Sequence, residues 1–429
     1  MSRIAVIGSG PAGCVLAYGL LAGGHDVTLY SDRTPDQWLN ESKPTGSAYI
    51  YDEVVDIERK LGMDFWSRDA FQGHGFLYDG IPTPGAAPLS IAGRNEYGRP
   101  GSAIDQRLRV SRWLEDLEPR GGRLVIESVT PARLDAIAAA SDLTVLAAGK
   151  ADLASAIAVD PARSFTEPQR NLAMVIVRSR TGHVRDWFAD RVPYAPIKFN
   201  RIDDTGEYFW VPYHHKTAGA TMSLLLEARP GSLMDRFGTA RSAGDVLDAA
   251  REIVRATMPY EAHIADDMEL IEDDPHGWLA GRFTPVVREA FGRLPSGGLV
   301  IPVGDTAITF DPIAGQGGNF ANRSADFLAS VINEHGGEHY DEEFLTRIST
   351  DLWTHFGRNS WTFNNHFLGV ADDTTRLVMR TAAQNPDAGD TLFNGFVRPD
   401  RMLPALKDRR VAEEFARTYP ARVAEPVPA

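Results

Sequence analysis

The first thirty residues pass from a continuous apolar run, through a glycine-rich turn, into helical spacing and then a second apolar run. Residues 3–7 are apolar after their first position, which is typical of a strand buried in a parallel sheet. The turn at 8–13 reads Gly-Ser-Gly-Pro-Ala-Gly, residues 14–22 have a mainly apolar helical pattern, and residues 26–30 form a second strand pattern. This order predicts the start of a βαβ unit.

The turn has the spacing G-x-G-x-x-G, and each of its positions has a physical use in a dinucleotide-binding βαβ unit. Gly8 permits the tight turn, Gly10 lets the backbone approach a pyrophosphate, and Gly13 lets the helix pack closely on the strand. Pro11 and Ala12 open the helix, whose free N–H groups and positive dipole end favour a phosphate. We therefore expect a bound nucleotide here. The alternative is a tight strand–helix turn that binds nothing.

Two kinds of pattern alternate along the rest of the chain. Between about 165 and 230 the strands are rich in β-branched and aromatic residues and are separated by Pro and Gly, as in an antiparallel sheet. We expect these strands at 172–177, 207–212 and 221–226. On either side lie α/β elements of the first kind, with a helix at 106–117 and strands at 123–126, 143–147 and 299–303. A helix is expected at 243–256, and the chain is mainly helical from 319 onward. The pattern predicts an α/β fold with an inserted β-rich region.

Composition excludes some function classes. Among the 429 residues, 58 are acidic and 44 basic, and the resulting net charge of −14 argues against a general nucleic-acid or anionic-membrane surface. The single cysteine, Cys14, cannot form an intramolecular disulfide, and it is expected to be a small buried residue of the first helix. No signal peptide pattern and no membrane-length apolar run is present, so we expect a cytoplasmic protein.

A second motif follows the strand at 299–303. Gly304-Asp305 stands at the strand end, where the carboxylate can accept hydrogen bonds from the ribityl chain of a flavin. The segment 311–319 reads Asp-Pro-Ile-Ala-Gly-Gln-Gly-Gly-Asn and leads into a helix. The exposed N–H groups at the start of this helix would lie beside negative charge on the flavin pyrimidine or on a peroxide.

Together the two motifs resemble the FAD-binding pattern of the flavoprotein monooxygenases related to p-hydroxybenzoate hydroxylase. Within that superfamily the chain resembles the oxygenase component of styrene and indole monooxygenases over about residues 1–370. The resemblance is carried by the Gly73-His74 pair and by the stretches 30–35, 103–108, 165–170 and 311–319.

The resemblance implies a Rossmann-type FAD-binding domain like that of p-hydroxybenzoate hydroxylase, an inserted β-rich substrate domain and C-terminal helices. We expect the FAD-binding domain to be discontinuous, at 1–75, 101–160 and 281–340. The β-rich substrate domain is expected at 76–100 and 161–280, and a C-terminal helical region at 341–429.

The resemblance also implies an activity. It indicates a two-component monooxygenase that takes FAD in reduced form from a separate NADH-dependent flavin reductase and uses O2 as co-substrate. In such enzymes a C4a-peroxide of the flavin epoxidises an aromatic alkene or oxygenates an indole or a sulfide. A homodimer is compatible with this family.

Motif matching carries over a set of expected cofactor contacts. They are Gly8, Gly10, Pro11, Ala12, Gly13, Ser31, Asp32, Arg33, Lys43, Arg107, Ala148, Gly149, Gly304, Asp305, Pro312, Gly315, Gln316, Gly317, Gly318 and Asn319. Arg107 is expected on a helix that faces the pyrophosphate, and its alternative is an ordinary solvated arginine.

Three departures from related patterns change the expectation. Ser31 stands where many FAD proteins have a Glu that binds the adenosine ribose, which predicts a weakly held, exchangeable flavin. The strand at 143–147 is followed by Ala148-Gly149-Lys150 instead of the Asp-Gly and Arg linked to NAD(P)H use, so we expect no direct hydride transfer from a nicotinamide. The resemblance is poor at 43–47, where Lys43 is the candidate for the family's basic residue near the flavin.

The reaction implied here needs a dry cavity and no protein nucleophile or metal. His74, Phe71 and Asn319 are the candidate catalytic residues, in pocket or flavin-stabilising roles. Further pocket candidates are Trp210, Phe310 and Asn364. For the aromatic residues an ordinary core position is an equal alternative, and His74 could be a structural histidine. No third ligand with suitable spacing accompanies His214-His215, so no metal site is expected.

Two alternative functions stay open. One is a flavin-dependent halogenase or a prenyl-type reductase on the same scaffold, although Phe209-Trp210-Val211-Pro212 only partly matches the W-x-W-x-I-P signature of halogenases. The other is a flavin-binding protein without turnover, which the altered 43–50 segment allows.

Overall fold

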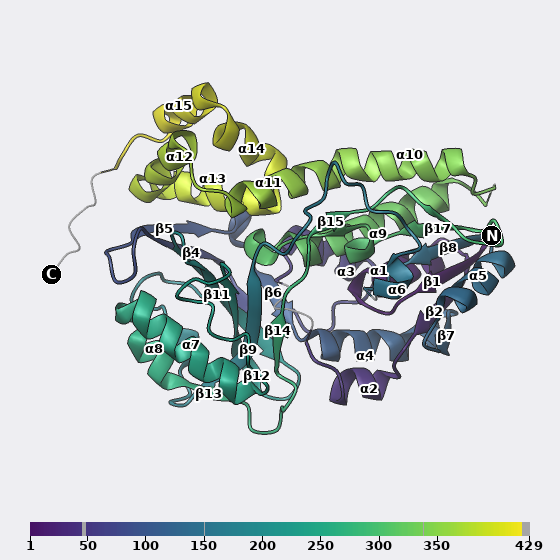
Figure 1. The fold of residues 1–429 in the computed structure, drawn as a ribbon, viewed down its shortest axis with the longest axis horizontal. Helices are drawn as coiled ribbons and strands as arrows, with labels where there is room; N and C mark the ends of the chain where they lie inside the picture. The colour runs from purple at the N-terminus through teal and green to yellow at the C-terminus, as the bar shows by residue number, and fades with distance from the viewer. Residues whose placement is uncertain (45–48, 150, 338, 423–429) are drawn as a thin grey trace. The chain divides into compact units, whose positions relative to one another are not determined.

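A computed structural model describes residues 1–44, 49–149, 151–337 and 339–422 (Figure 1). The chain divides into two compact units, each assembled from three separate segments. Unit 1 consists of Met1–Asp69, Ile104–Gln169 and Phe283–Trp361. Unit 2 consists of Ala70–Ala103, Arg170–Arg282 and Thr362–Ala429.

Unit 1 is built on a six-stranded sheet with the order β16-β17-β8-β1-β2-β7. Its strands are β1 (Arg3–Ile7), β2 (Asp26–Ser31), β7 (Arg123–Ile126), β8 (Leu143–Leu146), β16 (Gly292–Arg293) and β17 (Leu299–Pro302). All neighbours are parallel except β16 and β17. The chain leaves β1 toward β2 on one side, while β8 lies on the other. This reversal creates the crevice in which doubly wound sheets bind their ligands.

Helices enclose this sheet. They are α1 (Pro11–Ala22), α2 (Pro35–Asn40), α3 (Asp52–Lys60), α4 (Gln106–Leu117), α5 (Pro131–Ala140), α6 (Ala151–Ala154), α9 (Gln316–Glu334) and α10 (Glu342–Leu352). Helix α1 packs on α9 so closely that a Cβ at Gly19 would lie 2.6 Å from the Cβ of Ala329. A short ribbon of β15 (Val286–Val287) and β18 (Ile308–Thr309) and a π-helical turn, Trp353–Gly357, complete unit 1.

Unit 2 is built on a largely antiparallel sheet with the main order β13-β9-β12-β11-β10-β4-β5. Its strands are β3 (Gln72–Gly73), β4 (Gly75–Ile81), β5 (Leu89–Arg94), β6 (Gly101–Ile104), β9 (Asn171–Ser179), β10 (Pro196–Ile202), β11 (Gly206–His215), β12 (Gly219–Ala228), β13 (Met268–Leu270) and β14 (Trp278–Gly281). The pair β4 and β10 is parallel. Strand β14 pairs with β9, and β6 pairs with β11 and β3.

Each face of this second sheet has its own set of side chains, because neighbouring positions on a strand point to opposite faces. Trp210 is opposite Leu224, and both belong to a core that also includes apolar residues of α7 (Ala243–Thr257) and α8 (Ala262–Asp267). Phe209 is opposite Leu225 and also opposite Phe199 on β10, so these three side chains share the other face.

The C-terminal helices of unit 2 pack on the β4–β5 end of the sheet. They are α12 (Asp373–Gln384), α13 (Pro386–Val397), α14 (Pro399–Lys407) and α15 (Arg409–Thr418). The rings of Phe76 on β4 and Phe393 on α13 stack with centroids 4.9 Å apart. Helix α11 (Arg358–Leu368) begins in unit 1 and ends in unit 2.

The expected fold class is confirmed: a parallel nucleotide-binding type of sheet is interrupted by a β-rich insertion and followed by helices. The helices after residue 340 do not form a unit of their own. Residues 341–361 cluster with unit 1 and later ones with unit 2. None of the described helices combines the length and the low polarity that crossing a membrane requires.

Candidate functional site

The glycine turn of unit 1 is packed against the end of the neighbouring strand β8. Gly8 has a φ of +115°, and a Cβ there would lie 2.7 Å from the carbonyl carbon of Ala147. A Cβ at Gly13 would lie 1.9 Å from the Gly8 carbonyl oxygen. Any side chain at either position would force strand and helix apart, so both glycines are required by the backbone itself.

The same turn leaves open space at its outer side. A Cβ added at Gly10 or at Gly149 would meet no protein atom within 4 Å. Gly10 is the N-cap of α1, and no side chain caps the helix. A ligand backbone could therefore approach the first turn of α1 directly, where N–H groups and the helix dipole favour a phosphate.

The turn after β17 reaches the same place. Gly304 has a φ of +59°, and its Cα packs against Ala12 of α1, where a Cβ would lie 2.7 Å from the Ala12 Cβ. Thr306 Oγ1 donates a hydrogen bond to the Ala148 carbonyl oxygen at 3.0 Å. The carboxyl ends of β1, β8 and β17 thus meet at one edge of the sheet, and together these loops form what we call the glycine crevice, residues 8–13, 147–149, 304–306 and 315–318.

Asp305 is the carboxylate of this crevice. Its side chain is exposed, yet protein atoms are dense around it, which places it in a hollow. Oδ1 lies 3.9 Å from where a Cβ of Gly317 would be, at the start of α9. Partial desolvation raises the pKa of the Asp305 carboxyl to about 6. The group is ionised at neutral pH and can accept hydrogen bonds from hydroxyl groups in the crevice.

The start of α9 forms the far wall. Gly315, in left-handed conformation with φ of 61°, precedes the helix, and no side chain caps it. Pro312 belongs to the 3₁₀ turn before it, which Asp311 caps through a 3.2 Å hydrogen bond from the Ile313 N–H. Gln316 is buried and donates to the Ala314 carbonyl oxygen at 3.0 Å. The exposed backbone of this segment, and not its long side chains, is what a ligand could contact.

Asn319 connects α9 with the segment before α3. Its Oδ1 accepts a hydrogen bond from the Tyr51 N–H at 2.9 Å, and its Nδ2 donates to the carbonyl oxygens of Tyr49 and Gly315 at 2.8 and 2.9 Å. The side chain is buried, and these three backbone contacts use both Nδ2 hydrogens and one lone pair of Oδ1. These contacts give Asn319 a positioning role at the crevice wall, and its contact with the flavin stays a prediction.

Ser31 is likewise used inside the protein. It is fully buried, its Oγ lies 2.8 Å from Ser9 Oγ, and it donates to the Arg33 carbonyl oxygen at 2.6 Å. Trp38 Nε1 donates to Ser9 Oγ at 3.0 Å. These contacts explain the missing Glu: the serine closes the end of β2 and does not present a ribose anchor. The neighbouring Asp32 and Arg33 are partly exposed.

Arg107 is not the solvated arginine of the alternative interpretation. It is fully buried at the start of α4, and its Nε and Nη2 lie 2.9 and 2.7 Å from the carboxylate oxygens of Asp105, which also caps the helix. The pair is electrically neutral, so Arg107 adds little net positive charge to the crevice. Lys43 is exposed, and partial desolvation lowers the pKa of its amine. Residues 45–48 and Lys150 lie outside the described residues.

The remaining candidates divide into buried and exposed groups. Phe71 and Trp210 lie in the helix-covered core of unit 2, where Arg185 stacks 4.6 Å above the Phe71 ring. Phe310 belongs to a core cluster of unit 1 with Phe320 and Trp361. These aromatic residues occupy ordinary core positions, which was the alternative to a role in the pocket.

His74, between β3 and β4, is exposed, and desolvation lowers the pKa of its imidazole, so it is neutral at pH 7. Asn364 on α11 is fully buried, and neither its Oδ1 nor its Nδ2 has a hydrogen-bond partner. Among the described residues no cluster of His, Cys, Asp or Glu could hold a metal ion. His215 instead bonds to Asp274 at 2.9 Å.

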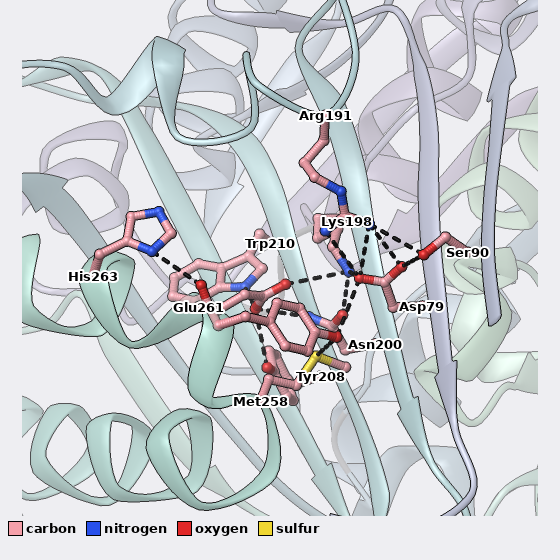
Figure 2. A network of polar contacts seen from close by, with 11 residues as sticks. Asp79, Ser90, Arg191, Lys198, Asn200, Tyr208, Trp210, Met258, Glu261 and His263 are labelled. Carbon is pink, nitrogen blue, oxygen red and sulfur yellow. Dashed lines mark hydrogen bonds and ion pairs between the residues drawn. The ribbon is translucent and has the colours of Figure 1, made fainter. Parts of the chain in front are cut away.

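Sequence reasoning missed a buried charge network in unit 2, which Figure 2 shows. Lys198 Nζ lies 2.8 Å from Asp79 Oδ2 and 3.3 Å from Glu261 Oε1, and all three side chains are buried. Glu261 Oε2 accepts hydrogen bonds from Asn200, Tyr208 and Trp210 at 3.2, 3.0 and 3.3 Å. Arg191 and Ser90 also bind Asp79. The available sequence signal was a lysine between the apolar residues Ile197 and Phe199 of β10.

Similarity to known proteins agrees with this geometry. Residues 149–263 match the family model described as "Styrene monooxygenase A putative substrate binding domain". Styrene monooxygenase StyA of Pseudomonas fluorescens is 26% identical and aligns with 98% of this chain and 99% of its own length. StyA of a Pseudomonas sp is 26% identical over 93% of this chain and 94% of its own length. This chain is a styrene monooxygenase-like, FAD-dependent monooxygenase.

The fold of this monooxygenase is also that of other flavoproteins. A flavin-dependent brominase aligns with 97% of this chain and 99% of its own length, with a TM-score of 0.63 at 13% identity. At that identity the likeness shows a shared fold and nothing about halogenation.

FAD is the cofactor, and the described residues fit it. The open positions at Gly10 and Gly149, the uncapped starts of α1 and α9, and the exposed Asp305 supply the space and the donor and acceptor groups that a dinucleotide needs. Cys14 lies behind this surface, where burial raises the pKa of its thiol to about 12 and keeps it unreactive.

Proposed function

We propose that this chain is the oxygenase component of a two-component system, which takes reduced FAD from a separate NADH-dependent flavin reductase. With O2 it oxygenates a small aromatic alkene, indole or sulfide through a C4a-peroxyflavin. One oxygen atom of O2 enters the substrate, and the other leaves as water with the two hydrogens of the reduced flavin. The observation that carries the proposal is the near full-length similarity to StyA combined with one glycine turn built for one dinucleotide.

Each part of the glycine crevice has a role in this proposal. The backbone of 8–13 and the start of α1 hold the pyrophosphate, and Asp305 accepts hydrogen bonds from the ribityl hydroxyl groups. The backbone N–H groups from Gln316 to Gly318, at the start of α9, lie along the flavin pyrimidine and stabilise negative charge there. Asn319 keeps that wall in place.

The adenosine end is held weakly in this account. Ser31 faces inward, which leaves Asp32 and Arg33 as the partly exposed contacts. Arg33 lies 5.0 Å above the Trp38 ring, and its nearest Asp32 oxygen is 3.9 Å away, so its charge is only weakly compensated. A weak ribose contact suits a flavin that arrives reduced and leaves oxidised.

Substrate recognition is proposed for unit 2, because the family-model match covers most of its sheet. One face of that sheet is filled by α7, α8 and the Lys198 network. The opposite face carries Phe199, Phe209 and Val211 in register and is suited to an apolar aromatic substrate. His74, neutral at pH 7, can offer a hydrogen bond.

The test is product analysis with a reconstituted system. Purified chain, FAD, O2, NADH and an unrelated flavin reductase are incubated with styrene, indole and an aryl sulfide. We expect an epoxide, an oxidised indole or a sulfoxide that depends on both proteins. Rapid loss of the oxidised FAD spectrum with NADH but without reductase would refute the two-component assignment. Bromide-dependent products would indicate a halogenase, and absence of any oxygenated product in the presence of hydrogen peroxide scavengers would indicate flavin binding without turnover.

A further inference from the structure

A second hollow lies in unit 1, beside β17 and apart from the glycine crevice. It has a volume of about 490 Å³, counting the part that opens to solvent. Its walls come from β17, α9, α10, the β15–β18 ribbon and the π-helical turn. Most lining side chains are apolar, among them Val287, Ile308, Phe327, Leu352 and Trp353, while Arg163, Arg288 and Ser349 are polar. We call this the arginine hollow.

Arg288 carries an uncompensated charge at this hollow. Its side chain has no carboxylate within ion-pair distance among the described residues, and its Nε is buried without a hydrogen-bond partner. Its Nη1 donates a hydrogen bond to the Thr306 carbonyl oxygen at 3.3 Å. Desolvation lowers the pKa of this guanidinium. A half-buried cation beside apolar side chains is unfavourable unless an anion joins it.

Arg163 is placed differently. It forms an ion pair with Asp160, and its guanidinium stacks 4.5 Å from the ring centroid of Trp353. Asp160 therefore balances Arg163, and the two arginines with this aspartate leave a net charge of +1 at the hollow. Trp353 begins the π-helical turn, a rare backbone form that is frequent at functional sites.

We propose that the arginine hollow binds a small monocarboxylate with an apolar body, a single ring or a short chain. The carboxylate would pair with the free edge of Arg288, since a guanidinium offers two parallel N–H donors to a carboxylate. The apolar body would lie against Val287, Phe327 and Trp353. A phosphate fits poorly, because it needs more donors than the apolar walls supply and carries more charge than the hollow compensates.

This site is connected to the turn that carries Asp305. The Arg288 N–H donates to the Ala307 carbonyl oxygen at 2.9 Å, and Nη1 reaches Thr306. A carboxylate bound to Arg288 would hold this side chain and thus the 304–306 turn. We expect the bound carboxylate to change the affinity of the chain for FAD. Binding of the carboxylate itself does not depend on flavin chemistry, so it can be measured on the FAD-free chain.

The test uses benzoate and butyrate on the full-length, FAD-free chain, followed by thermal unfolding and calorimetric titration. We expect a saturable rise in Tm with benzoate, as for any ligand that binds only the folded state, and no rise with benzamide. Phosphate at equal ionic strength should have no specific effect. No benzoate effect in the wild type, or an equal effect of benzamide, overturns the proposal. An equal effect of phosphate would make this a general anion site and also overturns it.

Substitutions in the arginine hollow test whether benzoate binds at this location. Arg288→Gln should weaken benzoate binding roughly ten- to hundredfold, the loss of one charge-assisted pair. Arg123→Gln, an exposed arginine of unit 1 with only a 3.9 Å contact to Asp26, should leave it unchanged. If Arg288→Gln does not fold, Trp353→Phe takes its place: it should retain benzoate binding but lose the tryptophan fluorescence change that we expect benzoate to cause in the wild type. A fluorescence change that persists in Trp353→Phe contradicts the location.

Discussion

The two units treat polar groups in opposite ways. The glycine crevice of unit 1 leaves backbone and one carboxylate open, with no protein atom near the outer side of Gly10 and Gly149. The Lys198 network of unit 2 pairs every one of its main charges internally, with Asp79 and Glu261 around the lysine (Figure 2). This difference indicates that the glycine crevice is a ligand-binding surface, whereas the charges of the Lys198 network stabilise a particular arrangement of strands.

Substitutions in the glycine crevice should therefore weaken FAD binding without lowering the stability of the fold. Substitutions in the Lys198 network should lower stability and leave FAD binding unchanged. Burial alone would raise the pKa of the Asp79 carboxyl, but Lys198, Ser90 and Arg191 lower it overall. The Asp79 carboxylate therefore stabilises the fold at pH values above the pKa that it has in the unfolded chain. This stabilisation is lost as the pH falls through the lower pKa that Asp79 has in the folded chain.

The largest expected effect comes from breaking the closed network. Lys198→Met leaves Glu261 buried without its cation and Asp79 with Arg191 alone, and we expect a loss of about 3–5 kcal/mol in the free energy of unfolding of unit 2. Denaturant unfolding followed by tryptophan fluorescence measures it, with FAD affinity retained. Lys60→Met, an exposed lysine on α3, is the control and should change stability by less than about 0.5 kcal/mol. A loss below about 1 kcal/mol in Lys198→Met would show that the network is not structural.

The next effect comes from filling the open crevice. Gly10→Ala introduces a methyl group that meets no protein atom but occupies space that the pyrophosphate needs, so FAD affinity should fall roughly ten- to hundredfold. Tm of the FAD-free chain should stay the same. Gly238→Ala, also with open space around its Cβ position but located in unit 2, is the matched control. Unchanged FAD affinity in Gly10→Ala would place the flavin elsewhere.

A smaller effect concerns pH. The raised pKa of Asp305, about 6, means that the ionised acceptor becomes available as pH rises, so FAD affinity should grow roughly fourfold from about pH 5.5 to 7. Asp305→Asn should abolish this dependence. By linkage, a folded pKa above the unfolded value means that the FAD-free wild type loses stability as pH rises through 6, and the variant should not. A pH profile of FAD binding that is identical in both proteins contradicts the assignment.

The smallest effect is expected at Ser31. Ser31→Ala removes its hydrogen bonds to Ser9 and Arg33 and should cost about 1 kcal/mol of stability while changing FAD affinity less than about twofold. Equilibrium binding of FAD and thermal unfolding measure the two quantities. A tenfold loss of affinity with unchanged Tm would show that Ser31 contacts the ribose after all.

Local signals in the sequence predicted much of unit 1. The strand at 3–7 and the helix at 106–117 occur at the expected residues, and Gly8 and Gly13 stand where the backbone admits no Cβ. These features depend on near neighbours and on turn chemistry. The directions of Ser31 and Asn319 could not be predicted, because their partners, Ser9 and Tyr49 with Tyr51, are set by tertiary packing.

Contacts between residues that are distant in the chain could not be predicted from the sequence either. Asp79, Lys198 and Glu261 are far apart in the chain, and only the parallel register of β4 with β10 brings the first two together. Trp210 looked like a pocket wall, yet its indole N–H is bound by Glu261 on the helix-covered face. The division of the C-terminal helices between the units likewise depends on packing that no local pattern encodes.

The central claim is that the glycine crevice holds FAD for the oxygenation reaction. A crystal structure of the chain with FAD, in oxidised or dithionite-reduced form, tests it most directly. We predict the pyrophosphate beside residues 8–13, the ribityl chain within hydrogen-bond distance of Asp305 and the flavin pyrimidine along the start of α9. Flavin bound at any other place, with the space between 8–13 and 312–318 left free of it, would contradict the account.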